Sequence, residues 1–562
     1  MEFLKKKTLT YTLSLLVLIA AIVLVNLLSR HLLVRFDLTE EKRYSMSEAT
    51  ENLLSELEEP VYVEVYLAGD INAEFSRLQT SIQQTLDQFK TYARGNIQYK
   101  FIDPNAAASA NARNEFYRSL INKGIQPTTV FDDVEGKKTQ KLIFPGAVLN
   151  YKNRTESVIL LNGNNAAGAK EAINQSIENI EYQLAITIKN LVRSERAKVA
   201  LIQGHGEPTG PELFGFTQAL KNKFDLLSLN DLSALENFDA AVFIKPAAKF
   251  TDEELYDIDQ YVMNGGKTLF FIDGLGVSVD SIKDYGAMAL PLEKNLDQLL
   301  FKYGVRVNDN VLQDVNSGNF PIVAGNMGNS ANVQLMPWPY YIIFNNYGKH
   351  PIVNGINAVY GKFVSSVDTL ATSGVKKTPL IYTSNYSRAL QGPVLISFES
   401  LKTDMKHENF NQPNIPVAYL LEGEFTSAFK NRLAPENRSS ASLKKESEQN
   451  AMIVVGDADM VLSVMDKKND KPFKLGVDPY AQHPSAFANE QLLLNMLNYL
   501  LDDEGLIISK NKDYKIRPLD KVKVQNDKLW VQIINVALPI LIILIFGVAR
   551  YYWRKKKYAN FK

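Results

Sequence analysis

The chain has 562 residues, with 62 basic and 62 acidic side chains, and this balance gives no electrostatic case for binding nucleic acid. It contains no cysteine, which excludes disulfides, thiolate metal sites, CxxC redox chemistry and a cysteine nucleophile. Its five histidines do not form a metal-binding motif and no motif for ATP is present, so we expect neither a metal nor a cofactor.

Two apolar stretches, one near each end of the chain, have the length of a membrane span. They cover residues 9–28 and 530–549, and about 20 residues are enough for a helix to cross the hydrocarbon core. A cleaved signal peptide is disfavoured for the first stretch, because its apolar run is long and no small-residue cleavage site follows it. We therefore predict two transmembrane helices on either side of a large body.

Basic residues flank both predicted spans on the side away from the body, at Lys5 to Lys7 and at Arg550 and Arg554 to Lys557. Short basic tails stay in the cytoplasm, whereas a long domain is translocated largely regardless of its charge. The predicted topology therefore has both termini in the cytoplasm and the body outside it. Residues 1–29 are the first tail and span, and residues 529–562 are the second span and tail.

After a membrane-proximal linker at residues 30–59, the pattern alternates between strand and helix. The linker includes a short helix that starts at a capping box over Ser45 to Glu48 and ends before Pro60. Residues 60–194 are predicted to form a first α/β domain with a thioredoxin-like topology that lacks the cysteines. Its expected strands cover residues 61–67, 97–102, 147–151 and 157–161, and its expected helices cover residues 75–93 and 173–191.

Residues 195–504 are predicted to form a second α/β domain. Strands at 198–203, 240–244 and 268–272 alternate with helices, which implies a parallel sheet of the flavodoxin-like or amidotransferase-like kind. Residues 311–400 are rich in Gly, Pro and Asn and are interpreted as an insertion. The remaining expected elements are strands at 380–383, 394–398 and 452–455, a polar mobile loop at 435–450, a helix at 489–501 and a linker at 505–528.

The candidate ligand site is the turn formed by Gly204, His205, Gly206 and Glu207. It follows a sheet strand and precedes a helix, which is where doubly wound folds usually bind ligands. The two glycines permit close backbone approach, and His205 and Glu207 are suited to acid–base work, but a purely structural turn explains them more simply. Asp273, Asp457 and Asp459 also follow strands of this sheet and are candidates to line the same crevice, although solvated loop carboxylates are commoner.

The whole chain resembles the extracytoplasmic auxiliary subunits of ABC transporters, and within them the gliding-motility-associated component called substrate-binding. The resemblance rests on Arg35 to Thr39, Arg43 to Ser47, the Pro60–Val61 strand start, the Gly204 to Glu207 turn, the helix over 495–501 and the C-terminal span. It implies an inner-membrane complex with a periplasmic body, a separate permease subunit and a cytoplasmic ATPase subunit. It also implies a role in gliding motility linked to protein secretion, and it supplies no catalytic residues.

Three functions follow from these observations. The first, which we favour, is a non-enzymatic transporter subunit that docks on partners or transmits motion, and that acts as part of a multimer within the complex. The second is a solute-binding receptor, which needs a deep cleft between the α/β units. The third is a hydrolase or amidotransferase-like enzyme that uses the Gly204 to Glu207 turn, and the missing cysteine counts against it.

Overall fold

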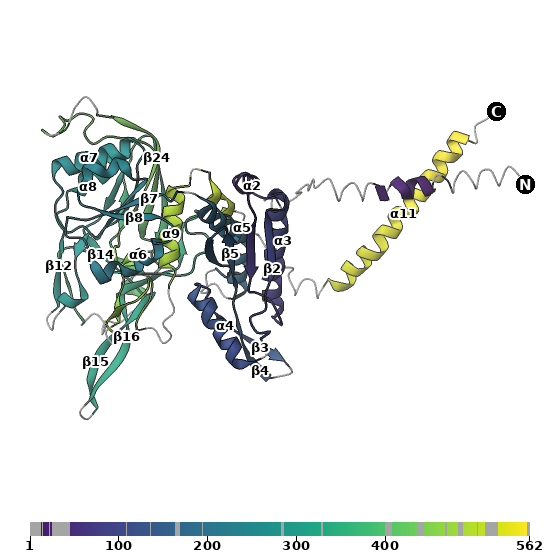
Figure 1. Ribbon diagram of the computed structural model, residues 1–562, viewed down its shortest axis with the longest axis horizontal. Helices are drawn as coiled ribbons and strands as arrows, with labels where there is room; N and C mark the ends of the chain where they lie inside the picture. The colour runs from purple at the N-terminus through teal and green to yellow at the C-terminus, as the bar shows by residue number, and fades with distance from the viewer. Residues whose placement is uncertain are drawn as a thin grey trace, which may run out of the picture. The chain divides into compact units, whose positions relative to one another are not determined.

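The structure is a computed structural model that describes residues 13, 15–21, 23–24, 45–107, 109–134, 137–162, 169–193, 195–282, 286–327, 330–398, 407–436, 438, 443–466, 469–480, 487–502, 504–511 and 527–558. It divides into two compact units, Met1–Lys512 and Asp513–Lys562. The first unit holds the α/β body and the second holds a long helix (Figure 1).

The long helix of the second unit is α11 (Lys528–Tyr558), which contains Pro539 and ends in a basic turn. Its segment Gln532–Lys557 is long and apolar enough to cross a membrane, and among the described residues it alone has this property. Half of the predicted first span, residues 9–28, lies outside the described residues. The positions described within it, 13, 15–21 and 23–24, are helical.

Residues 45–192 form an α/β subdomain built on a four-stranded sheet. Its elements are α2 (Glu48–Ser55), β1 (Val61–Val65), α3 (Ala73–Tyr92), β2 (Ile97–Phe101), α4 (Ala110–Asn122), β3 (Thr128–Val134), β4 (Lys137–Ile143), β5 (Gly146–Tyr151), β6 (Arg154–Ile159) and α5 (Ala169–Val192). The sheet order is β2-β1-β5-β6, with β1 parallel to β2 and antiparallel to β5. The expected strands and helices are present, while α4 and the β3–β4 hairpin are additional. The thioredoxin-like assignment stays a prediction.

Helix α5 lies between two hydrophobic cores. Ile180, Leu184 and Ile188 belong to the core of the four-stranded sheet, whereas Tyr182 belongs to the core of the second subdomain. A helix that is covered on several sides buries more than one stripe of residues. Its Glu181 carboxylate accepts hydrogen bonds from the backbone N–H and the hydroxyl of Ser47, each at 2.8 Å. This contact ties the start of α2 to α5.

The second subdomain is built on an eight-stranded mixed sheet. Its elements are β7 (Lys198–Ile202), α6 (Phe214–Leu220), β8 (Asp225–Leu229), β9 (Ala240–Ile244), α7 (Asp252–Met263), β10 (Lys267–Phe271), α8 (Leu296–Tyr303), β17 (Asn346–Tyr347), β20 (Val375–Tyr382), β23 (Pro416–Thr426), β24 (Glu446–Val455) and α9 (Asn489–Leu500). The order is β17-β20-β23-β24-β10-β9-β7-β8. The strands from β24 to β8 are parallel, as predicted, but β23, β20 and β17 are antiparallel.

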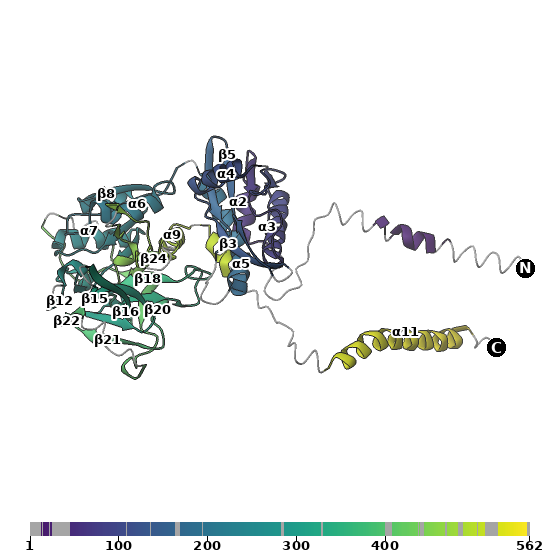
Figure 2. The same cartoon turned by 90° about the horizontal axis from the view of Figure 1, so that it is seen from below.

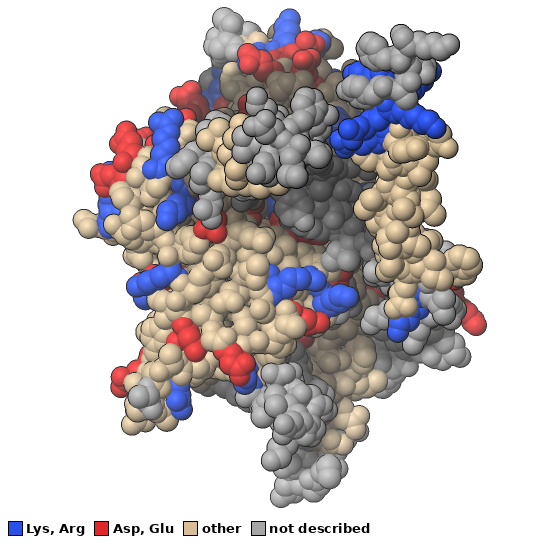
Figure 3. All heavy atoms as spheres, turned by 90° about the vertical axis from the view of Figure 1, so that its right-hand side faces the viewer, with Lys and Arg blue, Asp and Glu red and all other residues tan. Residues whose placement is uncertain are grey.

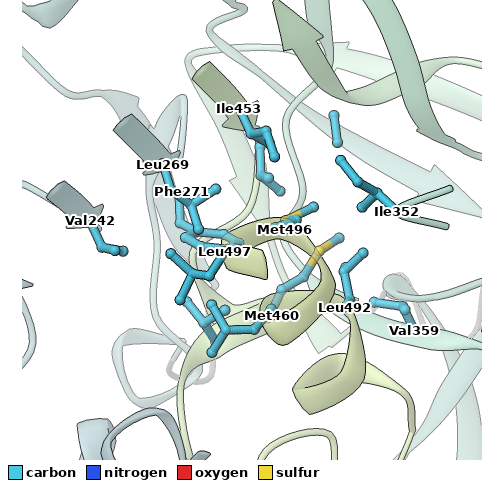
Figure 4. Close-up of a cluster of buried hydrophobic side chains, with 14 of the residues drawn as sticks. Val242, Leu269, Phe271, Ile352, Val359, Ile453, Met460, Leu492, Met496 and Leu497 are labelled. Carbon is cyan, nitrogen blue, oxygen red and sulfur yellow. The ribbon is translucent and has the colours of Figure 1, made fainter. Parts of the chain in front are cut away.

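Helices cover both faces of this sheet, because its central strands are apolar on both sides. Helices α6 and α9 pack on one face, where Leu269, Phe271 and Ile453 meet Leu492, Met496 and Leu497 (Figure 4). Helices α7 and α8 pack on the other face against residues that include Phe243 and Phe270. Helix α7 begins at a capping box in which Thr251 and Glu254 exchange side-chain and backbone hydrogen bonds.

Between β10 and β24 the chain also forms a β-rich region with an aromatic core. Its strands are β11 (Leu275–Gly276), β12 (Ala287–Pro291), β13 (Val305–Val307), β14 (Asn310–Asp314), β15 (Ser317–Met327), β16 (Ser330–Phe344), β18 (Val359–Lys362), β19 (Val367–Thr369), β21 (Ser387–Gln391) and β22 (Val394–Ile396). The fully buried Trp338 packs against Phe320 and Tyr341, with ring centroids 4.7 and 4.9 Å apart. The β15–β16 hairpin projects from this region (Figure 1).

Two expectations about this part of the chain are wrong. The segment 394–398 does not continue the main sheet, because β22 pairs with β12 in a separate three-stranded sheet. The segment 435–450 is not a loop throughout, because Glu446 to Asn450 form the first half of β24 and pair with β23. In that half of the strand Glu446, Glu448 and Gln449 are exposed, whereas Ser447 and Asn450 are buried.

A short 3₁₀ helix, η9 (Leu506–Asn511), joins the two subdomains at the end of the first unit. Leu506 is buried in the core of the four-stranded sheet, and Ile507 is buried in the core of the eight-stranded sheet. The Ile507 N–H donates to Asp502, whose other oxygen accepts from Lys189 of α5 at 3.3 Å. The sequence pattern placed these residues in a linker, whereas the structure buries them.

Candidate functional site

The Gly204 to Glu207 turn lies at the carboxyl end of β7, next to the point between β7 and β9 where the strand order of the sheet reverses. Gly204 and Gly206 have φ of +118° and +80°, values that a side chain would strain. Glu207 accepts a 2.6 Å hydrogen bond from the His205 backbone N–H. The carbonyl of His205 accepts hydrogen bonds from Ala247 and Ala248, each at 2.8 Å, so the turn is tied to the loop after β9.

The His205 side chain is buried and enclosed by protein groups. Its ring stacks on Phe250 with centroids 3.7 Å apart, and its Nε2 lies 3.2 Å from Glu254 Oε1. Its Nδ1 lies 3.4 Å from Glu207 Oε1, and neither atom has a hydrogen-bond partner among the described residues. Burial alone would raise the pKa of Glu254, but hydrogen bonds from Thr251 and His205 hold it below its usual value.

A second cluster at the same edge of the sheet is centred on Lys245, which follows β9. Its ammonium group lies 3.1 Å from Asp273, which follows β10, and 3.0 Å from Asp459, which follows β24. Burial by itself would lower the pKa of Lys245, but the two carboxylates raise it above its ordinary value. Burial raises the pKa of Asp273 by more than Lys245 lowers it. The other oxygen of Asp273 accepts a 2.8 Å hydrogen bond from the Ala458 N–H.

Asp457 and Lys362 extend this cluster toward the aromatic core. Asp457 is fully buried and accepts backbone hydrogen bonds from Lys362 and Asp459, at 3.0 and 2.8 Å. Burial, together with the charge of Asp459, raises its pKa well above the ordinary value. The Lys362 ammonium group lies over the rings of Tyr341 and Tyr360, and burial lowers its pKa despite the nearby carboxylates.

The predicted site residues therefore fall into two groups. Asp273, Asp457 and Asp459 lie together, as the positions after their strands suggested, and Lys245 joins them. No hydrogen bond or ion pair between described residues links His205 or Glu207 to Asp273, and the 245–250 loop lies between the two groups. Lys245 was missed because a lone lysine after a strand resembles any surface lysine. In the described part of the chain, no group of three His, Asp or Glu residues is arranged to hold a metal ion.

The structure also contains a cavity of about 450 Å³ at the opposite, amino-terminal edge of the sheet. It is lined by Arg193 after α5, by Tyr261 of α7, by Lys267 of β10 and by Leu500 and Leu501 at the end of α9. Its volume is within the range of small-molecule sites. The cavity is thus separated from the Gly204 to Glu207 turn by the length of the sheet strands.

A buried lysine, Lys510, lies in η9. Its Nζ has no hydrogen-bond partner among the described residues and lies 5.2 Å from the centroid of the Tyr182 ring. Tyr182 Oη and Asn179 Oδ1, both on α5, are likewise buried without a partner in the described structure. Burial lowers the pKa of Lys510 to about 7. The amine is therefore held in a setting that disfavours its charged form.

The face of the molecule in Figure 3 carries basic and acidic side chains of the described residues mixed over the body. This mixture matches the balanced composition of the chain. A nucleic-acid-binding face would instead collect basic residues in one patch or stripe.

Comparisons with known proteins match this chain to two family models and to a bacterial relative over most of its length. Residues 196–496 match the family described as "ABC-type uncharacterized transport system", and residues 40–150 match a domain of unknown function. An "Uncharacterized protein" of Borreliella burgdorferi is 23% identical over 543 residues, which cover 94% of each chain. The solved "mmIFT52 N-terminal domain" covers 54% of this chain and 97% of its own, at 12% identity, with a TM-score of 0.31 that is too low to support an argument.

Proposed function

Because the chain belongs to the family of auxiliary components of ABC-type transport systems, we propose that it is a non-enzymatic subunit of an ABC transporter complex. In this proposal both ends of the chain anchor it in the inner membrane, with the termini in the cytoplasm and the body in the periplasm. Its partners are a permease subunit and a cytoplasmic ATPase subunit. Its role is to dock on these partners and to pass motion between the membrane and the body.

The observation that carries this proposal is the position of η9. This element is the last one described before the chain enters the unit that holds α11. Leu506 and Ile507 anchor it in the two hydrophobic cores, and Asn354 donates a 2.6 Å hydrogen bond to the Lys510 carbonyl. A pull on the chain beyond η9 therefore acts on both cores at once. This arrangement suits a subunit that responds to movement of a membrane partner.

The non-enzymatic part of the proposal is supported by how the carboxyl-terminal edge of the sheet is filled. His205 is stacked under Phe250, and Lys245 is held between two carboxylates. These contacts are made by the protein's own groups and they join neighbouring loops. Two alternative proposals are a ligand site at Gly204, His205, Gly206, Glu207 and Asp273, and a hydrolase or amidotransferase-like activity that uses the Gly204 to Glu207 turn.

The role in gliding motility and the link to protein secretion are supported by the sequence resemblance described above. A solute receptor is the second candidate, and the cavity of about 450 Å³ beside Arg193 and Tyr261 favours it. A receptor and a motion-transmitting subunit make different demands on the spans. A receptor needs them only as anchors, whereas a motion-transmitting subunit needs them to bind the permease.

The experiment replaces residues 9–28 and 530–549 with poly-Leu spans and leaves residues 30–528 unchanged. Intramembrane polar groups such as Gln532 and Asn535 usually face other helices, where each hydrogen bond contributes about 0.5–2 kcal/mol. We expect the tagged wild-type protein to co-purify permease and ATPase in mild detergent, and the poly-Leu protein to lose both.

Insertion of each protein is checked with single cysteines at Ser442 and Asn560, since the natural chain has none. An impermeant maleimide applied to spheroplasts should label the first position and spare the second. Equal recovery of permease and ATPase with the poly-Leu protein would place recognition in the body. If the wild-type protein recovers neither subunit, the transporter proposal is wrong.

A further inference from the structure

A small pocket with a basic lining lies where α5 meets the second subdomain. It has a volume of about 20 Å³, which is enough for one small group. Its charged lining consists of Lys189, Arg193, Arg196 and Lys223, and none of the described lining residues is acidic. The other lining residues are apolar or are asparagines of α5 and α9. A pocket of this composition favours an anion.

Three of these four basic groups have no counter-ion in the described structure. Lys189 is balanced by two carboxylates, which lie 3.3 and 3.4 Å from its ammonium group. The side chains of Arg193, Arg196 and Lys223 form no hydrogen bond or ion pair with other described residues. Cations gathered in a partly enclosed site repel one another, and salt screens this repulsion less than it does on an open surface. An anion in the pocket would balance them.

Lys223 shows most clearly that a counter-ion is missing. Its side chain is half-buried, and burial lowers the pKa of its amine below the ordinary value although the charges of Glu490 and Glu156 act in the opposite direction. Neither carboxylate forms an ion pair with Lys223 in the described structure. Burial likewise raises the pKa of Glu156 despite Lys223 and Arg196. The carboxylates of the protein therefore do not neutralise this part of the pocket.

The pocket adjoins the cavity of about 450 Å³ described above, because Arg193 and Leu501 line both. The lining of the cavity includes the carboxylates of Glu236 and Asp239. One oxygen of Asp239 accepts a 2.8 Å hydrogen bond from the Lys198 N–H, and its other oxygen has no partner among the described residues. The cavity therefore offers hydrogen-bond acceptors to a molecule that enters it.

We propose that this junction binds a small phosphate monoester whose organic part donates hydrogen bonds through hydroxyl or amino groups. The phosphate is held by Arg193, Arg196 and Lys223, and the organic part lies in the cavity beside Glu236 and Asp239. An arginine guanidinium pairs with two phosphate oxygens at once. A phosphate monoester carries a charge of about −1.5 to −2 at neutral pH, which suits a site with three unbalanced cations.

Other anions fit this site less well. A carboxylate and the phosphodiester of a lipid headgroup each carry a single charge, which leaves most of the positive charge unbalanced. Nucleic acids and anionic membranes bind to broad basic surfaces. This pocket admits only one small group, and carboxylates line the adjoining cavity.

A phosphate in the pocket would join the two subdomains. Arg193 directly follows α5, Arg196 lies just before β7, and Lys223 lies between α6 and β8. A ligand that binds only the folded state stabilises it, so binding should raise the thermal stability of the body. The site lies wholly within the body and is independent of the transporter role proposed above.

The test is isothermal titration calorimetry of the full-length protein in detergent micelles at about 0.15 M NaCl, which screens weak contacts between exposed charges. Inorganic phosphate should bind to the wild-type protein. Arg193→Gln, Arg196→Gln and Lys223→Met should each weaken its binding about tenfold or more, because each removes a charged hydrogen-bond donor. Arg118→Gln is the matched control, since Arg118 is exposed on α4 and lines neither space. Thermal unfolding verifies that each variant is folded.

Two esters test the organic part of the ligand. Glucose 6-phosphate offers hydroxyl donors, and aminohexyl phosphate offers an amine. At least one of them should bind about tenfold more tightly than inorganic phosphate. Glu236→Trp, which places a bulky side chain at the cavity, should remove this gain and leave the binding of inorganic phosphate unchanged.

Three results would overturn the proposal. They are a wild-type protein that does not bind inorganic phosphate, basic variants that bind it like the Arg118→Gln control, and esters that bind no more tightly than inorganic phosphate. The transporter role is tested by co-purification, so either proposal can fail while the other stands.

Discussion

Replacing Lys510 with methionine should strengthen the attachment of η9 to the body. The pKa of this lysine falls from 10.5 to about 7 on burial, and at 1.36 kcal/mol per pH unit the charged amine costs the attached state about 5 kcal/mol. Methionine keeps an unbranched apolar chain at the Tyr182 ring, with which a thioether also makes a favourable contact. Attachment of η9 in the variant should therefore be more favourable than in the wild-type protein by most of these 5 kcal/mol.

The pH dependence follows from the direction of the pKa change. Detached η9 binds a proton at Lys510 below pH 10.5, whereas attached η9 binds one only below about pH 7. Between these values protonation favours detachment, so attachment in the wild-type protein strengthens as the pH rises. Below pH 7 Lys510 is charged in both states, so the free-energy cost of burying its charged amine has its full value and no longer changes with pH. Lys510→Met therefore raises the equilibrium constant for attachment of η9 most at or below pH 7. The factor by which it raises this constant becomes about tenfold smaller for each pH unit above pH 7.

Native-state hydrogen exchange of the peptide covering residues 506–511 measures this opening directly. At pH 6–7 the variant should exchange roughly a thousandfold more slowly than the wild-type protein, after correction for the intrinsic rate. Lys376→Met is the control, since its lysine is largely exposed on β20 and its removal should leave this peptide unchanged. Equal protection in Lys510→Met and wild-type protein at pH 6–7 would refute the reasoning.

Two further predictions concern the carboxyl-terminal edge of the sheet. Lys245→Met should lower the free energy of unfolding by about 3–5 kcal/mol, since it leaves Asp273 and Asp459 without their cation. In denaturant titrations this loss should shrink as the pH falls, because burial raises the pKa of Asp273 and its protonation removes one of the unpaired charges. Lys249→Met, which removes an exposed pair with Glu293, should change stability by less than about 1 kcal/mol. His205→Gln should lower thermal stability because the stacking on Phe250 is lost. The variant should still co-purify the transporter subunits and keep most of the motility phenotype. A variant that is stable and assembled but inactive would favour the ligand-site alternative.

The sequence predicted elements well where local signals and packing agreed. Thr251 precedes the apolar pattern of α7 as a typical cap residue, and in the structure it is the N-cap of this helix, in a capping box with Glu254. Helix α4 was missed because it buries only Leu120, so its apolar spacing is weak. Strand β8 was missed because both of its faces are largely exposed, which removes the alternation expected of a strand. In these two elements tertiary position decided the conformation.

The candidate site was predictable in position but not in contacts. The carboxyl ends of parallel strands meet at one edge, so Asp273, Asp457 and Asp459 were candidates to line one crevice with the Gly204 to Glu207 turn, although solvated loop carboxylates are commoner. In the structure Asp273 and Asp459 share Lys245, and Asp273 and Asp457 are buried. Strand order alone does not reveal that a lysine with φ of +51° lies between them. Likewise, the β-like pattern at 394–398 does not tell which of two sheets the strand joins. Lys510 lay in a stretch that reads as a linker, and only burial distinguishes it from other lysines.

The position of Leu506 also determines when the body can finish folding. The core that contains Met46 and Val61 includes Leu506, and that residue is synthesised more than 400 residues after them. During synthesis the first subdomain must therefore persist with an apolar site open along α5, where η9 will later pack. Its closure coincides with the emergence of the segment that leads to α11. Completion of the fold therefore waits for the segment that precedes the C-terminal helix, and a chain that stops before residue 506 leaves both cores unfinished.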